Sequence, residues 1–234
     1  MSDKINMAIV FPGQGSQSVG MMNNIISSDP EIKKIFDIAS EILNYNILKV
    51  ISEGPKEKLN QTEITQPAIL LTSYALWMLW KKKSKLIPTV LAGHSLGEYS
   101  ALLCAGVISF EEAVNLVSER GKSMQRSVPS NMGAMAAILG LSNEVLENLC
   151  ADISSNEIVS VANYNSPGQT VISGHKIAVE RVINAAKEAG AKKAILLPVS
   201  VPSHCILMKN AADEFSQLLN DATFNDPEIP ILQN

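Results

Sequence analysis

The stretch PTVLAGHSLGEYSALLCAGV, residues 88–107, decides the fold. Residues 88–92 have the apolar character of a buried strand, and the following Gly-His-Ser-Leu-Gly turns directly into an apolar pattern typical of a helix. A serine between two glycines, after a strand and before a helix, is the context of a nucleophile elbow. The glycines permit a tight turn, which leaves the serine hydroxyl exposed at the positive end of the helix. We interpret Ser95 as a nucleophile and the backbone N–H of Leu96 as a donor to an oxyanion. The alternative is an ordinary turn that contains a serine.

Strands and helices alternate on both sides of this stretch. A short apolar run at 7–11 predicts a second buried strand. Apolar residues three and four positions apart predict helices over 31–48, 57–80 and 110–126. The apolar residues 67–80 are fewer than the roughly 20 that a bilayer span needs, so they predict a buried helix. The alternation favours an α/β fold with a parallel sheet.

After Pro129 the pattern changes to a different order of elements. It predicts, in turn, a strand at 133–139, a helix at 142–151, strands at 158–162 and 169–173, a helix at 175–189 and a strand at 193–199. The order β-α-β-β-α-β is the split βαβ unit of ferredoxin-like domains. We therefore predict a small domain of residues 128–199, inserted into a large domain made of 1–127 and 200–234.

The chain ends after a predicted helix at 206–220 and an apolar strand at 229–232. An exposed apolar strand is prone to aggregation unless it is paired. We therefore expect a C-terminal part of the large domain to be missing.

Composition narrows the class of protein. The 234 residues are 46% hydrophobic and 18% charged, which argues against disorder, and the net charge of −4 argues against a general nucleic-acid binder. The three cysteines are an odd number at wide spacings, which gives neither a disulfide framework nor a metal site and indicates a reducing compartment. The N-terminus has the pattern of a strand rather than of a signal peptide. We expect a cytoplasmic monomer with no metal and with no nucleic-acid or membrane partner.

A serine nucleophile needs a general base, and the chain has three histidines. His94 adjoins the serine on a sharp turn, where neighbouring side chains usually point apart. His175 opens a predicted helix, where a surface role is equally compatible with the pattern. His204 lies in the proline-bounded segment PVSVPSHC after the predicted small domain, which suits the wall of a cleft. We prefer His204 as the base, and a structural, hydrogen-bonded histidine is the alternative.

Two further candidates come from a loop and a helix. The glycine-rich loop FPGQGSQ, residues 11–17, matches neither G-x-G-x-x-G nor a Walker A loop. The backbone N–H of Gln14 could complete an oxyanion hole with Leu96, although a plain turn fits the pattern equally well. Arg120 lies among charged residues of a predicted helix, where a solvated arginine is the simpler interpretation. A functional role for Arg120 would require an anionic substrate, because a guanidinium can hold a carboxylate through two hydrogen bonds.

Eight separated stretches carry a resemblance to a known family. They are FPGQGSQ (11–17), QPA (66–68), AGHSLGEYSAL (92–102), ERGKSMQ (119–125), GAMAAI (133–138), NSPGQ (165–169), SGHK (173–176) and LPVSVPSHC (197–205). Together they resemble the bacterial malonyl-CoA:acyl carrier protein transacylases of fatty acid synthesis. The resemblance implies an α/β-hydrolase-like, parallel-sheet large domain with an inserted ferredoxin-like small domain, and an active site between them.

The resemblance also implies roles for single residues. Ser95 is similar to the acylated nucleophile, and His204 to its general base and acid. Arg120 is similar to the residue that pairs with the malonyl carboxylate. The remaining implied positions are the oxyanion-hole residues Gln14 and Leu96, the supporting His94, and Asn163 and Asn165, which fall in a stretch that lines the cleft.

The implied reaction is a ping-pong transfer of malonyl from malonyl-CoA, through a malonyl-serine ester, to the phosphopantetheine thiol of acyl carrier protein. No cofactor is implied. Members of the family continue past the last strand and supply a glutamine whose main-chain carbonyl orients the histidine, and no position here takes that role. A serine esterase or thioesterase, and a non-catalytic fragment that binds the carrier protein, are the alternative functions.

Overall fold

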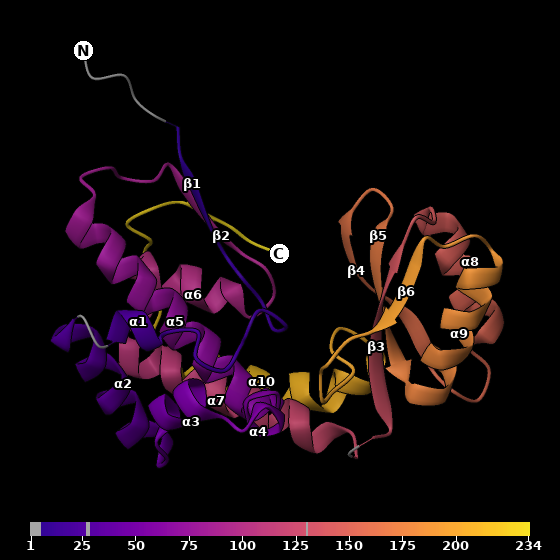
Figure 1. Ribbon diagram of the computed structural model, residues 1–234, viewed down its shortest axis with the longest axis horizontal. Coiled ribbons are helices and arrows are strands. Elements are labelled where there is room, and N and C mark those ends of the chain that lie inside the picture. The colour runs from indigo at the N-terminus through magenta and orange to yellow at the C-terminus, as the bar shows by residue number, and fades with distance from the viewer. Residues whose placement is uncertain (1–5, 27–28, 130) are drawn as a thin grey trace. The chain divides into compact units, whose positions relative to one another are not determined.

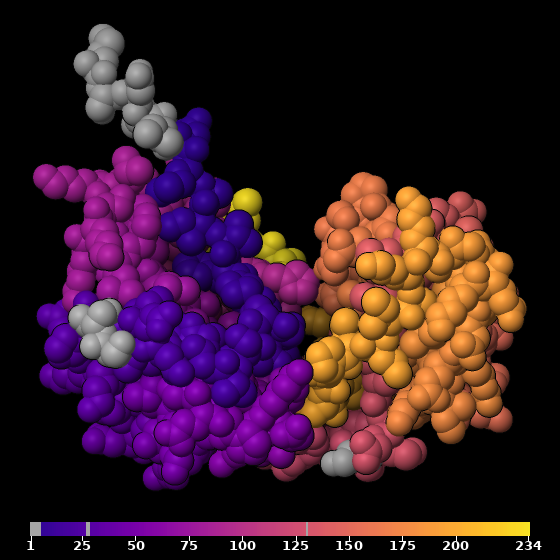
Figure 2. Space-filling model, in the orientation of Figure 1, coloured from indigo at the N-terminus to yellow at the C-terminus, as the bar shows by residue number. Residues whose placement is uncertain are grey.

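The computed structural model describes residues 6–26, 29–129 and 131–234, and the chain divides into two compact units (Figure 1). Unit 1 comprises Met1–Gly121 and Leu218–Asn234, and unit 2 comprises Lys122–Gln217. The chain therefore leaves unit 1, forms unit 2 and returns. The yellow C-terminal residues lie against the indigo and magenta part of the molecule in the space-filling view (Figure 2).

A parallel sheet forms the centre of unit 1. It consists of β1 (Ala8–Phe11), β2 (Val90–Gly93) and β7 (Ile231–Leu232), in the order β1-β2-β7. Ala8 pairs with Val90 and Leu91 pairs with Ile231, and both pairings are parallel. The predicted parallel α/β sheet is confirmed, with β2 in the middle. Because the elbow directly follows β2, it emerges between the ends of two neighbouring strands.

Seven helices lie wholly or mainly in the described part of unit 1, and two of the predicted helices are interrupted. They are α1 (Asn23–Ile26), α2 (Pro30–Leu43), α3 (Ile47–Glu53), α4 (Lys56–Leu59), α5 (Thr62–Lys83), α6 (Gly97–Cys104) and α7 (Phe110–Ser127), whose last turns belong to unit 2. The predicted helix 31–48 stops at Leu43 because Asn44 takes a left-handed φ of 59°, and Asn46 then caps α3 by accepting from the backbone N–H of Lys49 at 2.8 Å. The predicted helix 57–80 is likewise interrupted, between α4 and α5.

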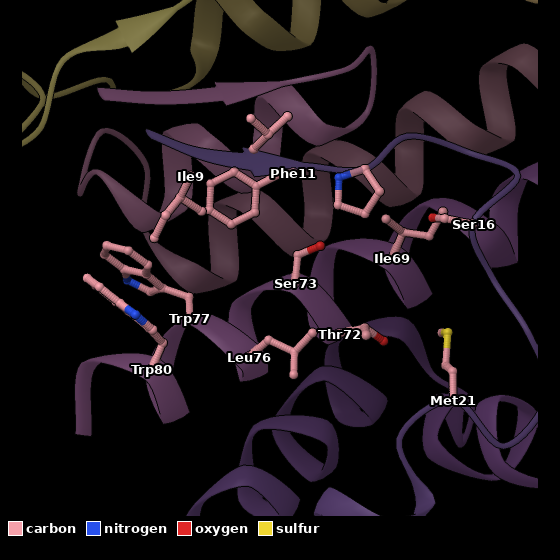
Figure 3. Close-up of a pocket in the computed structure, with 12 residues that line it drawn as sticks. Ile9, Phe11, Ser16, Met21, Ile69, Thr72, Ser73, Leu76, Trp77 and Trp80 are labelled. Carbon is pink, nitrogen blue, oxygen red and sulfur yellow. The ribbon is translucent and has the colours of Figure 1, made fainter. Parts of the chain in front are cut away.

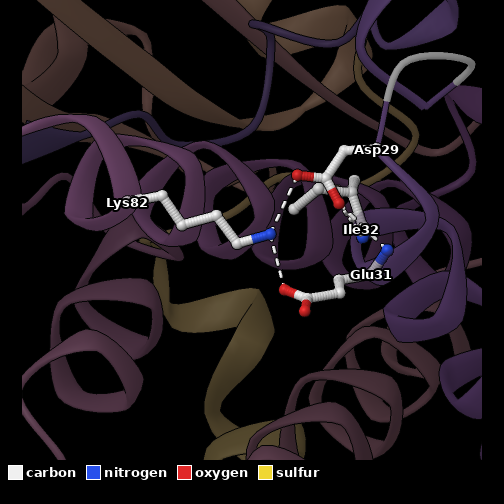
Figure 4. A network of polar contacts seen from close by, with 4 residues as sticks. All are labelled: Asp29, Glu31, Ile32 and Lys82. Carbon is white, nitrogen blue, oxygen red and sulfur yellow. Dashed lines mark hydrogen bonds and ion pairs between the residues drawn. The ribbon is translucent and has the colours of Figure 1, made fainter.

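The start of α2 is tied to the end of α5. Asp29 caps α2 by accepting from the backbone N–H groups of Glu31 and Ile32 at 2.9 and 3.4 Å. Lys82, in the last turn of α5, forms ion pairs with Asp29 and Glu31 (Figure 4). The same aspartate therefore satisfies a helix N-terminus and holds a second helix beside it.

α5 runs through the core of unit 1, as the sequence predicts for residues 67–80. Ala68, Leu70, Leu71 and Ala75 are completely buried in it. Full burial of a leucine side chain contributes about 1.5–3 kcal/mol. α5 is therefore central to the core of unit 1, and α2, α3, α4 and α6 pack against it.

Unit 2 contains the predicted β-α-β-β-α-β order. Its elements are β3 (Gly133–Leu139), α8 (Asn143–Ile153), β4 (Val159–Ser166), β5 (Gln169–His175), α9 (Lys176–Glu188) and β6 (Lys193–Leu196). The sheet is antiparallel with the order β4-β5-β3-β6, the strand arrangement of a ferredoxin-like fold. Ser142 caps α8 by accepting from the backbone N–H of Val145. The ferredoxin-like fold of the inserted unit is confirmed.

Unit 2 is longer than the 128–199 expected for the small domain. It also takes in the end of α7, the segment that leads to the turn η1 (Ile206–Met208), and most of α10 (Lys209–Asp221). A small apolar cluster joins these parts, made of Met124, Val128, Val201, Met208 and Ala211. The predicted domain bounds remain a prediction, and all strands of the predicted small domain lie inside unit 2.

Cys104, Cys150 and Cys205 are free thiols. In the part of the chain that the structure describes, no helix is long and apolar enough to cross a membrane.

Candidate active site

Ser95 lies in a tight turn between β2 and α6. Its φ is +52°, in the left-handed region that residues other than glycine rarely adopt. A Cβ at Gly93 would lie 1.9 Å from the carbonyl carbon of Gly97, and a Cβ at Gly97 would lie 2.2 Å from the carbonyl oxygen of Phe11. Only glycine fits at both positions. Leu96 follows Ser95 as the N-cap of α6 and is 1% exposed. The turn therefore has the strand–turn–helix geometry expected of an elbow, and the role of Ser95 as nucleophile stays a prediction.

The loop that carries Gln14 contacts this turn. The backbone N–H of His94 donates to the carbonyl oxygen of Phe11 at 3.1 Å. A Cβ at Gly13 would lie 2.6 Å from the carbonyl oxygen of His94, so the two backbones touch. Gln14 is held from the other side, because its Nε2 donates to Oγ1 of Thr62 at 2.9 Å. The structure therefore brings Gln14, His94, Ser95 and Leu96 into one region of unit 1.

Arg120 lies where α7 crosses α5. A Cβ at the next residue, Gly121, would lie 2.7 Å from Cα of Glu63, so the two helices approach closely. This crossing lets Nη1 of Arg120 donate to Oε1 of Gln66 at 2.8 Å, and the guanidinium carbon lies 5.7 Å from the centre of the Tyr99 ring. Arg120 is only partly exposed. The interpretation of a solvated surface arginine is therefore wrong.

Burial and two neighbouring side chains shift the pKa of Arg120 in opposite directions. Burial lowers the pKa of the guanidinium, and the nearby Tyr99 and Glu98 oppose that shift. Burial also raises the pKa of the Tyr99 hydroxyl. Arginine remains protonated in proteins, so Arg120 is a partly desolvated cation with a neutral tyrosine beside it. Such a group can form strong hydrogen bonds to a carboxylate.

The other predicted site residues belong to unit 2. His204 is exposed and has a φ of +61°, in a segment where the backbone N–H of Ser203 donates to the carbonyl oxygen of Val201 at 3.1 Å. Asn163 and Asn165 lie on β4, where the pairing with β5 is irregular. Of these two, Asn163 is half-buried and Asn165 is exposed.

His175 has a structural contact. Its Nδ1 accepts from the backbone N–H of Ile158 at 2.8 Å, beside the ladder between β4 and β5. This contact fixes the ring at the end of β5. It supports the choice against His175 as the general base.

A cavity of about 430 Å³ lies between β1 and α5 (Figure 3). Trp77 and Trp80 stack at one end with ring centres 5.2 Å apart, and Met21 lies at the other end. Neither Ser95 nor Arg120 lines this cavity. Among residues 6–26, 29–129 and 131–234, no group of three or more histidine, cysteine, aspartate or glutamate side chains is placed to hold a metal ion.

Comparison with known proteins places this chain in a family. The model of the acyl transferase domain matches residues 8–234. The chain belongs to the acyl transferase domain family. It is 52% identical over 227 residues to the malonyl CoA-acyl carrier protein transacylase of Escherichia coli strain K12, an alignment that covers 97% of this chain and 74% of that protein.

Solved structures of acyl transferases are similar over the same region. An acyl carrier protein S-malonyltransferase from Vibrio cholerae is 54% identical with a TM-score of 0.90, covering 98% of this chain and 75% of that chain. A malonyl-transacylase solved in complex with a type II PKS acyl-carrier protein is 49% identical with a TM-score of 0.94, covering 98% of this chain and 74% of that chain.

Sequence reasoning missed several residues that contact the predicted site residues. Thr62 and Gln66 hold Gln14 and Arg120, and Glu98 and Asn234 contact the elbow. Gln66 and Glu98 fall in the stretches QPA and AGHSLGEYSAL, which mark the family. No local pattern, however, indicates partners that lie 48, 54 or 136 positions away in the sequence.

Proposed function

We propose that this chain transfers a malonyl group from malonyl-CoA to the phosphopantetheine thiol of an acyl carrier protein, in fatty acid synthesis. The observation that carries the proposal is that unit 1 contains both a serine on a strained turn, Ser95, and a partly buried arginine, Arg120. The elbow suits acyl transfer through a serine ester, and the arginine suits an acyl group that ends in a carboxylate. The names of the relatives, malonyl transacylases and malonyltransferases, support the same substrate.

The first half-reaction forms the ester. His204 takes the proton of the Ser95 hydroxyl as Oγ attacks the thioester carbonyl of malonyl-CoA. The backbone N–H groups of Gln14 and Leu96 donate to the oxyanion of the tetrahedral intermediate. The C–S bond then breaks, and CoA leaves with the proton from His204. In the second half-reaction the carrier thiol attacks the ester by the same steps, and Ser95 regains its proton.

Arg120 gives the proposed selectivity. A malonyl carboxylate pairs with the guanidinium, whereas an acetyl group would leave this partly desolvated cation without that partner. His94, Asn163 and Asn165 are proposed to line the substrate site, as the sequence resemblance implies. We further propose that the protein acts in the cytoplasm as a monomer, and that the reaction needs no bound cofactor because serine, histidine and backbone donors supply its acid–base and electrostatic steps.

Intact-protein mass spectrometry after mixing with malonyl-CoA tests the proposal. The chain should gain the mass of one malonyl group, and Ser95→Ala should gain nothing. Acyl carrier protein that bears phosphopantetheine should then remove the adduct and gain the same mass. Release of free malonate in place of transfer would indicate a thioesterase. A folded chain that never forms the adduct would contradict the proposed function and favour the non-catalytic fragment that binds the carrier protein.

A further inference from the structure

The side-chain amide of Asn234 contacts three parts of the nucleophile elbow. Its Oδ1 accepts from the backbone N–H of Ser95 at 3.1 Å. Its Nδ2 donates to the carbonyl oxygen of Gly93 at 2.7 Å and to Oε2 of Glu98 at 2.6 Å. These partners lie at the end of β2, in the turn, and in the first turn of α6. One side chain therefore links the strand, the nucleophile and the helix.

Asparagine matches these partners in hydrogen-bonding type. A peptide carbonyl and an ionised carboxylate only accept, and a backbone N–H only donates. An amide supplies two N–H donors and one acceptor oxygen, so all three partners are satisfied in a single orientation of the amide. An aspartate of the same size would keep the contact to Ser95. It would lose both donors and bring a second carboxylate next to Glu98.

The register of the sheet places Asn234 at the elbow. Leu91 pairs with Ile231 and Ala92 pairs with Leu232. The same register, continued by two residues along both strands, brings Asn234 level with His94, immediately before the nucleophile. The contact is thus a consequence of the parallel pairing of β7 with the strand that carries the elbow.

Ser95 needs such support. A residue other than glycine at a φ of +52° is strained, and the strain persists only where the surroundings hold the backbone in place. Asn234 holds the peptide on the N-terminal side of Ser95 at its N–H, and it holds the preceding carbonyl of Gly93. These two contacts restrain the two peptide planes that precede Ser95. The peptide that carries the N–H of Leu96 is the next one along the chain, so Asn234 acts on it through the backbone of Ser95.

Glu98 extends this support toward Arg120. The Glu98 carboxylate, which accepts from Asn234, also acts electrostatically on the Arg120 guanidinium. The amide therefore connects the nucleophile with the residue proposed to select malonyl.

We propose that Asn234 is a positioning residue for acyl transfer, which holds Ser95 and the oxyanion donor Leu96 in their reactive geometry. The proposal rests on the proposed function for its chemistry and on the three hydrogen bonds for its geometry. Asn234 acts through Ser95, so its loss should slow ester formation at saturating substrate and leave the binding of malonyl-CoA nearly unchanged.

Single-turnover acylation of the full chain by malonyl-CoA tests this role. Asn234→Ala should lower the maximal rate of acylation about tenfold or more, as expected when hydrogen bonds to a reactive group are lost. The half-saturating concentration of malonyl-CoA should stay within about twofold, since Asn234 supplies no contact to the acyl carboxylate. Asn234→Asp, which keeps the size of the side chain, should be at least as slow as Asn234→Ala. Gln233→Ala is the matched control, because it removes the neighbouring exposed amide.

Amide hydrogen exchange measured by NMR gives a readout that does not depend on activity. The backbone N–H of Ser95 should exchange faster in Asn234→Ala than in the wild type or in Gln233→Ala. Unchanged exchange at Ser95, or wild-type acylation by both Asn234 variants, would overturn the inference. A rise in half-saturating malonyl-CoA that accounts for the whole effect would also overturn it. If the wild type itself is not acylated, the proposed function fails, and the exchange measurement still decides whether Asn234 holds the elbow.

Discussion

Replacement of Arg120 by alanine should convert a malonyl-selective enzyme into one with little preference between malonyl-CoA and acetyl-CoA. The guanidinium is oriented by Gln66 at 2.8 Å and lies over the Tyr99 ring, so a carboxylate that reaches it meets a fixed and partly dehydrated cation. A hydrogen bond to a charged group contributes about 1.5–3 kcal/mol. The loss in kcat/KM for malonyl-CoA is therefore about 10- to 150-fold, at about 1.4 kcal/mol for each factor of ten.

The assay compares the rates of Ser95 acylation by malonyl-CoA and by acetyl-CoA, and the ratio of the two rates is the quantity of interest. Arg126→Ala is the control, because it removes an arginine of the same helix, which is exposed and paired with Glu214 at 3.3 Å. A surface ion pair of this kind contributes about 0–1 kcal/mol. Thermal unfolding should accompany the kinetics, since the alanine leaves the buried Gln66 without this donor. An equal loss of rate with both thioesters would refute the assignment of Arg120 to the carboxylate.

Three further changes test the fold and its electrostatics. Gly97→Ala should lower the free energy of unfolding by about 1–3 kcal/mol in urea, because its Cβ would lie 2.2 Å from the carbonyl oxygen of Phe11; an unchanged midpoint would contradict that close approach. Ser142→Ala should cost about 1 kcal/mol in the same assay, through loss of the N-cap of α8. No measurable loss would show that the cap does not stabilise the helix. Lys82 lowers the pKa of Asp29, so this contact stabilises the fold above the unfolded-state pKa, and its contribution is lost as pH falls through the folded-state pKa. Asp29→Asn should therefore lower Tm at neutral pH, with a difference from wild type that shrinks on acidification and would stay constant if the reasoning were wrong.

Local patterns predicted the elements of the fold well, and tertiary packing accounts for the differences. The split βαβ unit is visible in the sequence because strand and helix periods alternate and turn residues separate them. The break after α2 depends on Asn44, whose side chain tolerates a left-handed backbone, and the apolar pattern continues across it. The extension of unit 2 beyond 128–199 depends on the apolar cluster that contains Met124, Val201 and Met208, which come from distant segments of the chain. No local signal carries such contacts.

The residues of the candidate site also differ in whether a local sequence pattern indicates them. Ser95 was predicted as the nucleophile from a motif, because the tight turn leaves no room for a Cβ at Gly93 or Gly97, two positions to either side of it. Arg120 had no such signal, because its partial burial results from a crossing of two helices that are far apart in the sequence. The resemblance to a family, rather than the helical pattern, indicated its role. Asn234 had no local signal either, since its partners are set by the pairing of two strands.

The pairing of β7 with β2 therefore has a consequence beyond stability. Side chains alternate between the two faces of a strand, so a slip of β7 by one residue would turn the Asn234 side chain to the opposite face of the sheet. The amide would then lose Gly93 and Ser95 together, although the backbone ladder could form again in the new register. A short strand of two residues has few ladder hydrogen bonds with which to resist such a slip. The contacts of Asn234 to the elbow can form in only one register of β7 against β2. The strand pairing therefore places these contacts, and the contacts in turn stabilise that register. Support for the strained backbone at Ser95 and the register of the sheet are thus two results of the same three hydrogen bonds.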